Sequence, residues 1–358
     1  MMRLAFYAPL KPPDHPTPSG DRAMARGLMT ALERTGAEVT LASTLRSRDG
    51  SGDAALQASL FAQAEEQIAR LIPQGRRERW QAWVSYHNYY KAPDLIGPAV
   101  AGALGIPYLQ IESTRARKRL AGPWADFAAA AESAADAAAV IFYVTARDAE
   151  TLRRDAPTGQ HLIHLRPFLC RDTLPDAAAL SGPMLSVGMM RAGDKLASYR
   201  IIAETLTLLE GDWVLEIAGD GPARAEVAAL MAPFGDKVRI LGALPTDALQ
   251  SAYARASLLF WPGVNEAFGL TYLEAQAAGL PVVAQDRPGV RDVLAPGIYP
   301  APEAGAAALA HQLTALLAKP ELRQAAGTAA RDHIAAHHLL PAATQCLRRG
   351  LSAAGVAA

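Results

Sequence analysis

Short apolar runs alternate with helical patterns along the chain, in two successive series. The first series of apolar runs covers residues 4–8, 38–43, 83–86, 107–111 and 140–144. The second covers residues 184–187, 213–218, 237–241, 257–261 and 281–284. Because such alternation is typical of parallel sheets, it predicts an α/β protein with two doubly wound, Rossmann-like parallel-sheet domains facing a cleft.

The domain boundary is expected where this alternation lapses. Between residues 167 and 183 the chain is rich in Pro, Asp and Ser, which is typical of a linker. A length of 358 residues also suits two domains, since one core rarely grows past roughly 250 residues. We predict an N-terminal domain at 1–175, a second domain at 176–340, and a final helix at 341–358 that returns to the N-terminal domain.

Composition excludes several classes of protein. Lys plus Arg and Asp plus Glu number 35 each, so no net charge attracts nucleic acid, and no nucleic-acid partner is expected. Two cysteines, Cys170 and Cys346, provide no disulfide framework. No signal peptide is recognised, and no apolar stretch reaches the roughly 18 residues of a spanning helix. We expect a cytoplasmic protein without a transmembrane segment, which is compatible with peripheral membrane contact.

The most informative segment, residues 262–281, combines a strand end, a glycine-containing loop and a helix. Glu266 lies in the loop and Glu274 in the helix, and both carboxylates can face the cleft. The amides of Phe268, Gly269 and Leu270 begin the helix, where a phosphate is stabilised without a metal. The alternative is that both acids are simply exposed at an ordinary helix start.

A basic pair follows the first strand of the second domain. Gly188 ends that strand, and Arg191 and Lys195 lie four positions apart. Two cations beside a diphosphate neutralise the charge of a departing group, as a divalent metal does elsewhere. The alternative is a solvated charged loop, and Tyr199 and Arg200 are expected on a helix surface.

Residues 266–284 fit the pattern E-x-F-G-L-x-x-x-E-A-x-A-x-G-x-P-V-V-A, which resembles the signature of family 4 retaining glycosyltransferases of the GT-B fold. The resemblance implies that Glu266 hydrogen-bonds the donor sugar and that Glu274 binds the ribose hydroxyls. It also implies that the amides after Phe268 meet the donor diphosphate, and that the reaction retains anomeric configuration without a metal or other cofactor.

Three further turns are similar to loops of that family. Gly219 resembles a turn of the donor site, Leu244 resembles the loop that stacks the nucleotide base, and Gly20 resembles the loop against the diphosphate. For Gly20 the alternative is a plain helix cap by Ser19. A dehydrogenase fingerprint is not satisfied, because Arg224 stands where its third glycine is required.

Two residues of the first domain are candidates for catalysis. His87 follows a strand and points to the carboxyl edge of the sheet, where open α/β sheets bind ligands, although a structural histidine is an alternative. Glu112 stands where the family usually presents a histidine close to the donor sugar. An acid there can hydrogen-bond the sugar, act as base toward the acceptor hydroxyl, or stabilise positive charge at the anomeric carbon. A purely structural role is the alternative.

Other charged and imidazole groups admit plain explanations. A basic cluster follows Glu112, and it either grips a phosphorylated or acidic acceptor or forms a solvated helix face. Its members are Arg115, Arg117, Lys118 and Arg119. Two groups of closely spaced histidines, one near residue 161 and one near residue 333, are expected on the surface or in packing. Neither group has a Cys or acid at the spacing of metal ligands. The histidines of the two groups are His161, His164, His333, His337 and His338.

The sequence thus predicts a hexosyltransferase that moves a sugar from a UDP- or GDP-sugar to an unidentified acceptor hydroxyl. The residues expected to act in catalysis are Glu112, Glu266, Arg191, Lys195 and His87. The residues expected to bind the nucleotide sugar are Gly20, Gly188, Arg191, Lys195, Gly219, Leu244, Glu266, Phe268, Gly269, Leu270 and Glu274. The alternatives are a nucleotide-sugar epimerase of the same fold, which needs no acceptor, and a non-catalytic nucleotide-sugar binding protein.

Overall fold

The computed structural model of the protein describes residues 1–17 and 19–356. It divides into two compact units. The first comprises Met1–Cys170 together with the C-terminal segment that begins at Leu340, and the second comprises Arg171–Leu339. Pro18, which belongs to the glycine loop expected around Gly20, lies outside the described residues.

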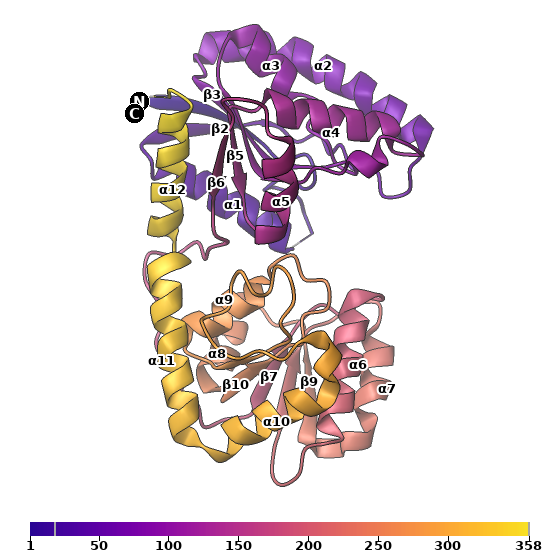
Figure 1. The fold of residues 1–358 in the computed structure, drawn as a ribbon, viewed down its shortest axis with the longest axis vertical. Helices are drawn as coiled ribbons and strands as arrows, with labels where there is room; N and C mark the ends of the chain where they lie inside the picture. Colours follow the sequence, from indigo (N-terminus) through magenta and orange to yellow (C-terminus); the bar gives the residue numbers. More distant parts are fainter. Residues whose placement is uncertain (18, 357–358) are drawn as a thin grey trace. The chain divides into compact units, whose positions relative to one another are not determined.

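The described residues of the first unit form a six-stranded parallel sheet in the order β2-β1-β3-β4-β5-β6 (Figure 1). The strands are β1 (Met2–Tyr7), β2 (Ala37–Ser43), β3 (Ala82–Asn88), β4 (Tyr108–Ser113), β5 (Val140–Tyr143) and β6 (His161–His164). The apolar runs predicted β1 to β5. They did not predict β6, because this edge strand has only two apolar residues, flanked by histidines.

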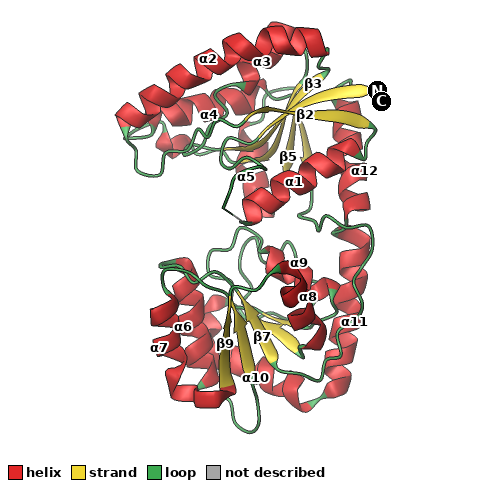
Figure 2. Ribbon diagram, turned by 180° about the vertical axis from the view of Figure 1, so that it is seen from behind, coloured by secondary structure: helices red, strands yellow, loops and turns green. Residues whose placement is uncertain are grey.

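Helices cover both faces of this sheet (Figure 2). They are α1 (Gly20–Glu33), α2 (Ala54–Glu78), α3 (Gly97–Leu104), α4 (Ala125–Ala137), α5 (Ala146–Asp155) and α12 (Leu340–Ala353), with a short 3-10 turn η1 (Arg117–Arg119). Although α12 ends the described chain, it packs against α1, β5 and β6. Gly350 permits this approach, since a Cβ there would lie 2.0 Å from the Phe142 ring.

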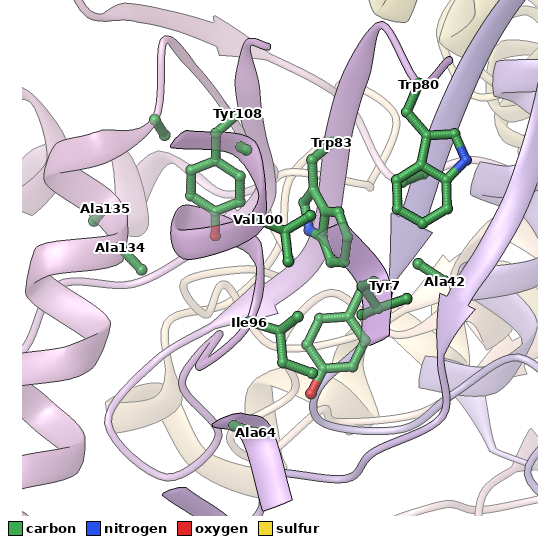
Figure 3. Close-up of a cluster of buried hydrophobic side chains, with 14 of the residues drawn as sticks. Tyr7, Ala42, Ala64, Trp80, Trp83, Ile96, Val100, Tyr108, Ala134 and Ala135 are labelled. Atoms are coloured by element: carbon green, nitrogen blue, oxygen red, sulfur yellow. The ribbon is translucent and has the colours of Figure 1, made fainter. Parts of the chain in front are cut away.

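Aromatic side chains fill the core between the sheet and the α2–α4 face (Figure 3). Trp83 is fully buried, and its ring meets those of Tyr7 and Trp80 edge to face at centroid distances of 6.3 and 5.9 Å. The indole N–H of Trp83 donates to Ser85 Oγ at 2.9 Å, so the buried polar atom is satisfied. This core fixes β1, β3 and β4, whose carboxyl ends carry the predicted residues of this unit.

The described residues of the second unit form a five-stranded parallel sheet in the order β11-β10-β7-β8-β9. The strands are β7 (Met184–Val187), β8 (Leu215–Ala218), β9 (Val238–Gly242), β10 (Leu258–Phe260) and β11 (Val282–Val283). After β7 the chain passes to β8 and β9 on one side, and it then crosses to β10 and β11 on the other. The carboxyl ends of β7 and β10 therefore form a topological switch point, the usual ligand position in open α/β sheets.

The helices of the second unit complete its layers. They are α6 (Asp194–Leu206), α7 (Arg224–Met231), α8 (Thr246–Arg255), α9 (Leu270–Ala277), α10 (Gly305–Ala318) and α11 (Pro320–His337), with short turns η2 (Ala232–Lys237) and η3 (Pro302–Ala304). The predicted class, an α/β protein with two doubly wound parallel sheets, is confirmed. Among the described residues, no helix combines the length and apolar character required to cross a membrane.

Candidate functional site

Glu266 is the centre of a charged network at the switch point of the second sheet. Its Oε1 accepts a hydrogen bond from Lys195 Nζ and another from Trp261 Nε1, the latter at 2.9 Å. Lys195 lies in the first turn of α6, and its ammonium is 5.3 Å from the centroid of the Trp261 ring. Both donors use the same oxygen, so Oε2 retains the capacity to accept a hydroxyl group of a ligand. Lys195 and Glu266, which were predicted separately as site residues, are thus in direct contact.

Gly188 and Gly219 are required by packing at the ends of β7 and β8. A Cβ on Gly188 would lie 2.6 Å from the Trp261 ring, and one on Gly219 would lie 1.9 Å from the Gly188 carbonyl oxygen. Tyr199 donates its hydroxyl to that same carbonyl at 2.8 Å and is fully buried. The prediction that Tyr199 lies on the helix surface is therefore wrong, because this face of α6 packs against the sheet.

The start of α9 presents main-chain amides at the same edge. Gly269 adopts a φ of 76°, a conformation that favours glycine, and no side chain caps the first turn of α9. Phe268 is buried, and Leu270 is the first helical residue. Uncapped amides at a helix start, together with the helix dipole, stabilise an anionic group.

Glu274 lies further along α9 in a second hydrogen-bonded pair. The Tyr253 hydroxyl donates to its Oε2 at 2.9 Å and lies 3.0 Å from Thr271 Oγ1. Burial raises the pKa of Glu274, and the Tyr253 hydrogen bond opposes this. The other carboxylate oxygen can accept a pair of vicinal hydroxyls, as a ribose presents them. Sequence reasoning missed Tyr253, since a tyrosine on α8 carries no signal of its distant partner.

Two other predicted residues lie at this edge without joining the network. Arg191, between β7 and α6, is exposed, and no side-chain partner for it is found among the described residues. Leu244 is half-buried and follows β9. The carboxyl edge of one sheet thus holds the predicted residues of this unit, and two of them, Lys195 and Glu266, form an ion pair that was not predicted.

In the first unit, His87 and Glu112 face each other from β3 and β4. His87 Nδ1 is 3.8 Å from Glu112 Oε1, and His87 Nε2 is 3.8 Å from Oδ1 of Asp21 in the first turn of α1. Both residues have left-handed backbones, with φ of 70° and 57°. His87 was predicted to follow its strand, but it lies within β3 at this strained bend. Such strain in non-glycine residues is typical of functional sites.

The protonation states of this pair depart from the ordinary ones. Burial raises the pKa of Glu112 to about 8, the nearby Asp148 and Asp21 carboxylates add to the rise, and Tyr86 opposes it. Burial lowers the pKa of His87 to about 4, against the effect of Asp21. Near neutral pH, His87 is therefore neutral and Glu112 is largely protonated. Such perturbed groups, set at the ligand-binding edge of a sheet, are candidates for acid–base chemistry.

Both side chains also retain unused hydrogen-bonding atoms. Within the described structure, the buried Nε2 of His87 and Oε2 of Glu112 have no hydrogen-bond partner. Buried polar atoms are rarely left in this state, because each lost hydrogen bond costs about 1–3 kcal/mol. These two atoms therefore retain the capacity to hydrogen-bond a further group.

Two of the four cations in the basic cluster after Glu112 are paired with carboxylates of the protein. The Arg115 side chain is 1% exposed and pairs with Glu132 at 2.8 Å and Asp136 at 2.6 Å. Arg117 lies 3.4 Å from Asp155. A solvated helix face was one interpretation of this cluster, and for Arg115 it is wrong, because the guanidinium turns inward to two carboxylates on α4.

The last predictions concern the loop before α1 and the absence of a metal site. Ser19 caps α1, accepting from the Arg22 amide at 3.3 Å, and Gly20 is the first helical residue. The helix-cap interpretation therefore holds for the described part of that loop. In the described ranges, no group of three or more His, Cys, Asp or Glu residues is arranged to hold a metal ion.

The chain is similar in sequence to known glycosyltransferases. Residues 196–333 match the family of glycosyl transferases group 1. Alpha-D-kanosaminyltransferase from Streptomyces kanamyceticus is 27% identical over 277 residues, which covers 72% of this chain and 71% of that enzyme. D-inositol 3-phosphate glycosyltransferase from Streptomyces bingchenggensis is 36% identical over 120 residues, but this match spans only 31% of the chain and 25% of that enzyme.

Solved structures share the fold over nearly the whole chain. Sucrose-phosphate synthase from Thermosynechococcus elongatus superimposes with a TM-score of 0.74 at 19% identity, covering 99% of this chain and 100% of that one. HepE from Anabaena, solved in complex with UDP-glucose, gives a TM-score of 0.68 at 15% identity, covering 98% and 100%. At these identities the likeness establishes a common fold.

Proposed function

We propose that this chain, a glycosyltransferase of the GT-B fold with a glycosyl transferases group 1 domain at residues 196–333, uses a nucleotide diphosphate sugar as its donor. In this proposal a hexose passes from a UDP- or GDP-sugar to an acceptor hydroxyl, with retention of anomeric configuration and without a metal. The observation that carries it is the Lys195–Glu266–Trp261 network beside the uncapped start of α9.

The donor fits the chemistry of the second unit. A diphosphate carries negative charge that the α9 amides and the Lys195 ammonium stabilise, and exposed Arg191 lies on the same edge. Glu266 offers its remaining oxygen to a sugar hydroxyl, and Glu274 offers a carboxylate to the ribose. HepE, a structural relative, is described in complex with UDP-glucose, which supports a UDP-sugar as the first donor to test.

The proposed reaction breaks the bond between the anomeric carbon and the diphosphate oxygen, and the electron pair leaves with the nucleotide diphosphate. Charge thus develops on the leaving oxygen, where fixed cations and amides stabilise the transition state more than the ground state. The acceptor oxygen forms the new bond to the anomeric carbon on the same face.

We assign acceptor activation to the first unit. Once ionised, the Glu112 carboxylate accepts the proton of the acceptor hydroxyl, and a pKa of about 8 makes it a stronger base than an ordinary glutamate. Neutral His87 donates or accepts a hydrogen bond at its free Nε2 and orients the bound molecule. This role for Glu112 takes the place of the family histidine at that position.

The proposal is tested by calorimetry and thermal shift of the full chain with UDP, GDP, ADP and their sugars, with and without a chelator. We expect one nucleotide diphosphate to bind in the presence of chelator and to lose affinity in a Glu274→Ala variant. Anomeric configuration of the product is then read by NMR. Absence of nucleotide binding, or binding that survives the loss of Glu274, would overturn the donor-site assignment.

A further inference from the structure

Two cations of the first unit are held by aromatic rings instead of carboxylates. Lys91 Nζ lies 5.6 Å from the centroid of the Tyr90 ring and 5.4 Å from that of Trp124. The Arg119 guanidinium lies 5.0 Å from the centroid of the Tyr90 ring and 5.6 Å from that of Trp124. The two rings are perpendicular, with centroids 5.7 Å apart. We name these four residues the cation–aromatic cluster.

The rings fix the position of these cations without cancelling their charge. A cation over an aromatic face is attracted to the ring quadrupole, and the ring itself stays neutral. Lys91 and Arg119 make no ion pair within the described residues. The acid that contacts this cluster is Asp49, whose carbonyl oxygen accepts the Trp124 indole N–H at 3.3 Å. Its carboxylate accepts hydrogen bonds from the Ser51, Gly52 and Asp53 amides and forms no ion pair with Lys91 or Arg119.

The neighbouring arginines provide an internal contrast. Arg115 and Arg117 belong to the same basic segment as Arg119, yet both are paired with carboxylates of the protein. Arg119 makes no ion pair within the described residues, although the Nε atoms of Arg115 and Arg119 are both buried without a hydrogen-bond partner there. The segment thus neutralises two of its four charges internally, and of the other two, Lys118 is exposed while Arg119 is held against the rings that also hold Lys91.

The cluster lies where this unit is expected to bind a molecule. Tyr90 and Lys91 directly follow β3, and Arg119 and Trp124 lie between β4 and α4. These two segments follow the strands that carry His87 and Glu112. Since ligands of open α/β sheets bind at this edge, the cations and the proposed base belong to one side of the first unit.

We propose that the cation–aromatic cluster binds a phosphomonoester of the acceptor, so that the substrate class is a phosphorylated sugar or polyol. A phosphomonoester carries a charge of about −1.5 to −2 at neutral pH, which matches two cations better than a single carboxylate does. This inference rests on the proposed function, because it names the acceptor of the same reaction. Phosphate provides three oxygens to the donors of Lys91 and Arg119.

The test compares phosphate binding in matched variants of the full chain. Inorganic phosphate is titrated by calorimetry into the wild type, the double variant Lys91→Gln/Arg119→Gln, and the control Arg117→Gln. The second-unit site is identical in all three, so a difference reports on the first unit. We expect phosphate affinity to fall by about tenfold or more in the double variant and to be unchanged in the control. Thermal melts verify folding, and Lys91→Arg is expected to retain binding.

A second arm uses glucose and glucose 6-phosphate, which differ only in the phosphate group. We expect glucose 6-phosphate to bind the wild type more tightly, and the preference to disappear in the double variant. Unchanged phosphate binding in the double variant, or equal losses in Arg117→Gln, would overturn the inference. Vesicles of anionic phospholipid that bind through Lys91 and Arg119, with no preference for glucose 6-phosphate, would also overturn it in favour of membrane contact.

These outcomes separate the inference from the proposed function. Nucleotide binding that depends on Glu274, with phosphate binding unchanged in the double variant, would leave the donor assignment standing and remove the anionic acceptor. Loss of phosphate binding in the double variant, without nucleotide binding to the wild type, would support the anion site and remove the donor assignment.

Discussion

Lys195 and Glu266 form an ion pair across a separation of 71 residues, from the first turn of α6 to the loop before α9. Trp261 directs its indole N–H to the same carboxylate oxygen at 2.9 Å. The pair holds a cation and a hydrogen-bond acceptor at fixed positions before any substrate binds. Preorganisation of this kind lowers the cost of stabilising the transition state.

Replacement of Glu266 by Gln is expected to lower kcat by about 10²–10³-fold, because the donor sugar loses a charged acceptor and Lys195 loses its partner. The change in affinity for nucleotide diphosphate alone should be smaller than the loss of kcat, since the diphosphate does not contact the sugar-binding oxygen and meets Glu266 only through Lys195. Initial rates and calorimetry measure the two effects. Glu210→Gln, at an exposed position of the same unit, is the control. A fully active Glu266→Gln enzyme would contradict the assignment.

Removal of the Tyr253 hydroxyl is expected to weaken nucleotide binding by roughly 5–10-fold, the effect of one lost hydrogen bond to a carboxylate. Tyr253→Phe leaves Glu274 without its donor and raises the pKa of this carboxyl further, so less of it is ionised to accept ribose hydroxyls. Tyr299→Phe is the matched control, because that hydroxyl donates to the Ala295 carbonyl elsewhere in the unit. Equal losses in both variants would indicate a general effect of hydroxyl removal.

Stability is expected to fall as pH rises from about 6.5 to about 8. The pKa of Glu112 rises from 4.5 in the unfolded chain to about 8 in the fold, so the folded protein holds the extra proton and loses this advantage with rising pH. The pKa of His87 is lowered from 6.5 to about 4, so its effect is a loss of stability as pH falls through that range. Above pH 6.5 the Glu112 effect, on the order of a few kcal/mol, is therefore no longer opposed by that of His87.

Denaturant unfolding of wild type and Glu112→Gln at several pH values measures this effect. The variant cannot ionise at this position, so its free energy of unfolding should decline less between pH 6.5 and 8. Parallel curves for the two proteins would show that Glu112 does not titrate in this range.

The reaction rate is expected to respond to pH in the opposite direction. If ionised Glu112 accepts the acceptor proton, kcat/KM should increase toward pH 8 and level off above it, as the carboxylate becomes populated. The Glu112→Gln variant should lose most of its activity, and its kcat/KM should no longer increase toward pH 8. A pH–rate profile with saturating donor provides the measurement, and a variant with the wild-type profile would exclude Glu112 as the base.

Addition of one methyl group at Gly188 is expected to destabilise the second unit by about 1–3 kcal/mol, because the new Cβ would lie 2.6 Å from the Trp261 ring. Displacement of Trp261 should also weaken its hydrogen bond to Glu266 and reduce kcat. Gly102→Ala, on α3 with no atom within 4 Å of its Cβ, should be neutral or slightly stabilising. Thermal unfolding of the two variants distinguishes the steric clash at Gly188 from the general effect of replacing a glycine by alanine.

The sequence by itself determined the class of fold and which residues gather at the carboxyl edge of the second sheet. Buried parallel strands need continuous apolar runs, and the helices between them need one apolar face. The strands and helices of both series could therefore be predicted from the local pattern of apolar residues. The segment from Glu266 to Glu274 could also be identified as a candidate site, because its polar groups all lie in one loop and one helix that are contiguous in the sequence. The edge strand β6 could not be predicted in this way, since only two of its residues are apolar.

Only the tertiary structure decided which distant side chains meet. Local periodicity cannot show that Tyr199 turns its hydroxyl to the Gly188 carbonyl, or that Trp261 shares the Glu266 carboxylate with Lys195. It also cannot show that Arg115 turns inward to two carboxylates while Arg119 is held by aromatic rings. These differences depend on the packing of elements far apart in the chain, and packing decides burial, pairing and pKa. The sequence alone determines which groups are present, and the fold decides which of their charges are available to a ligand.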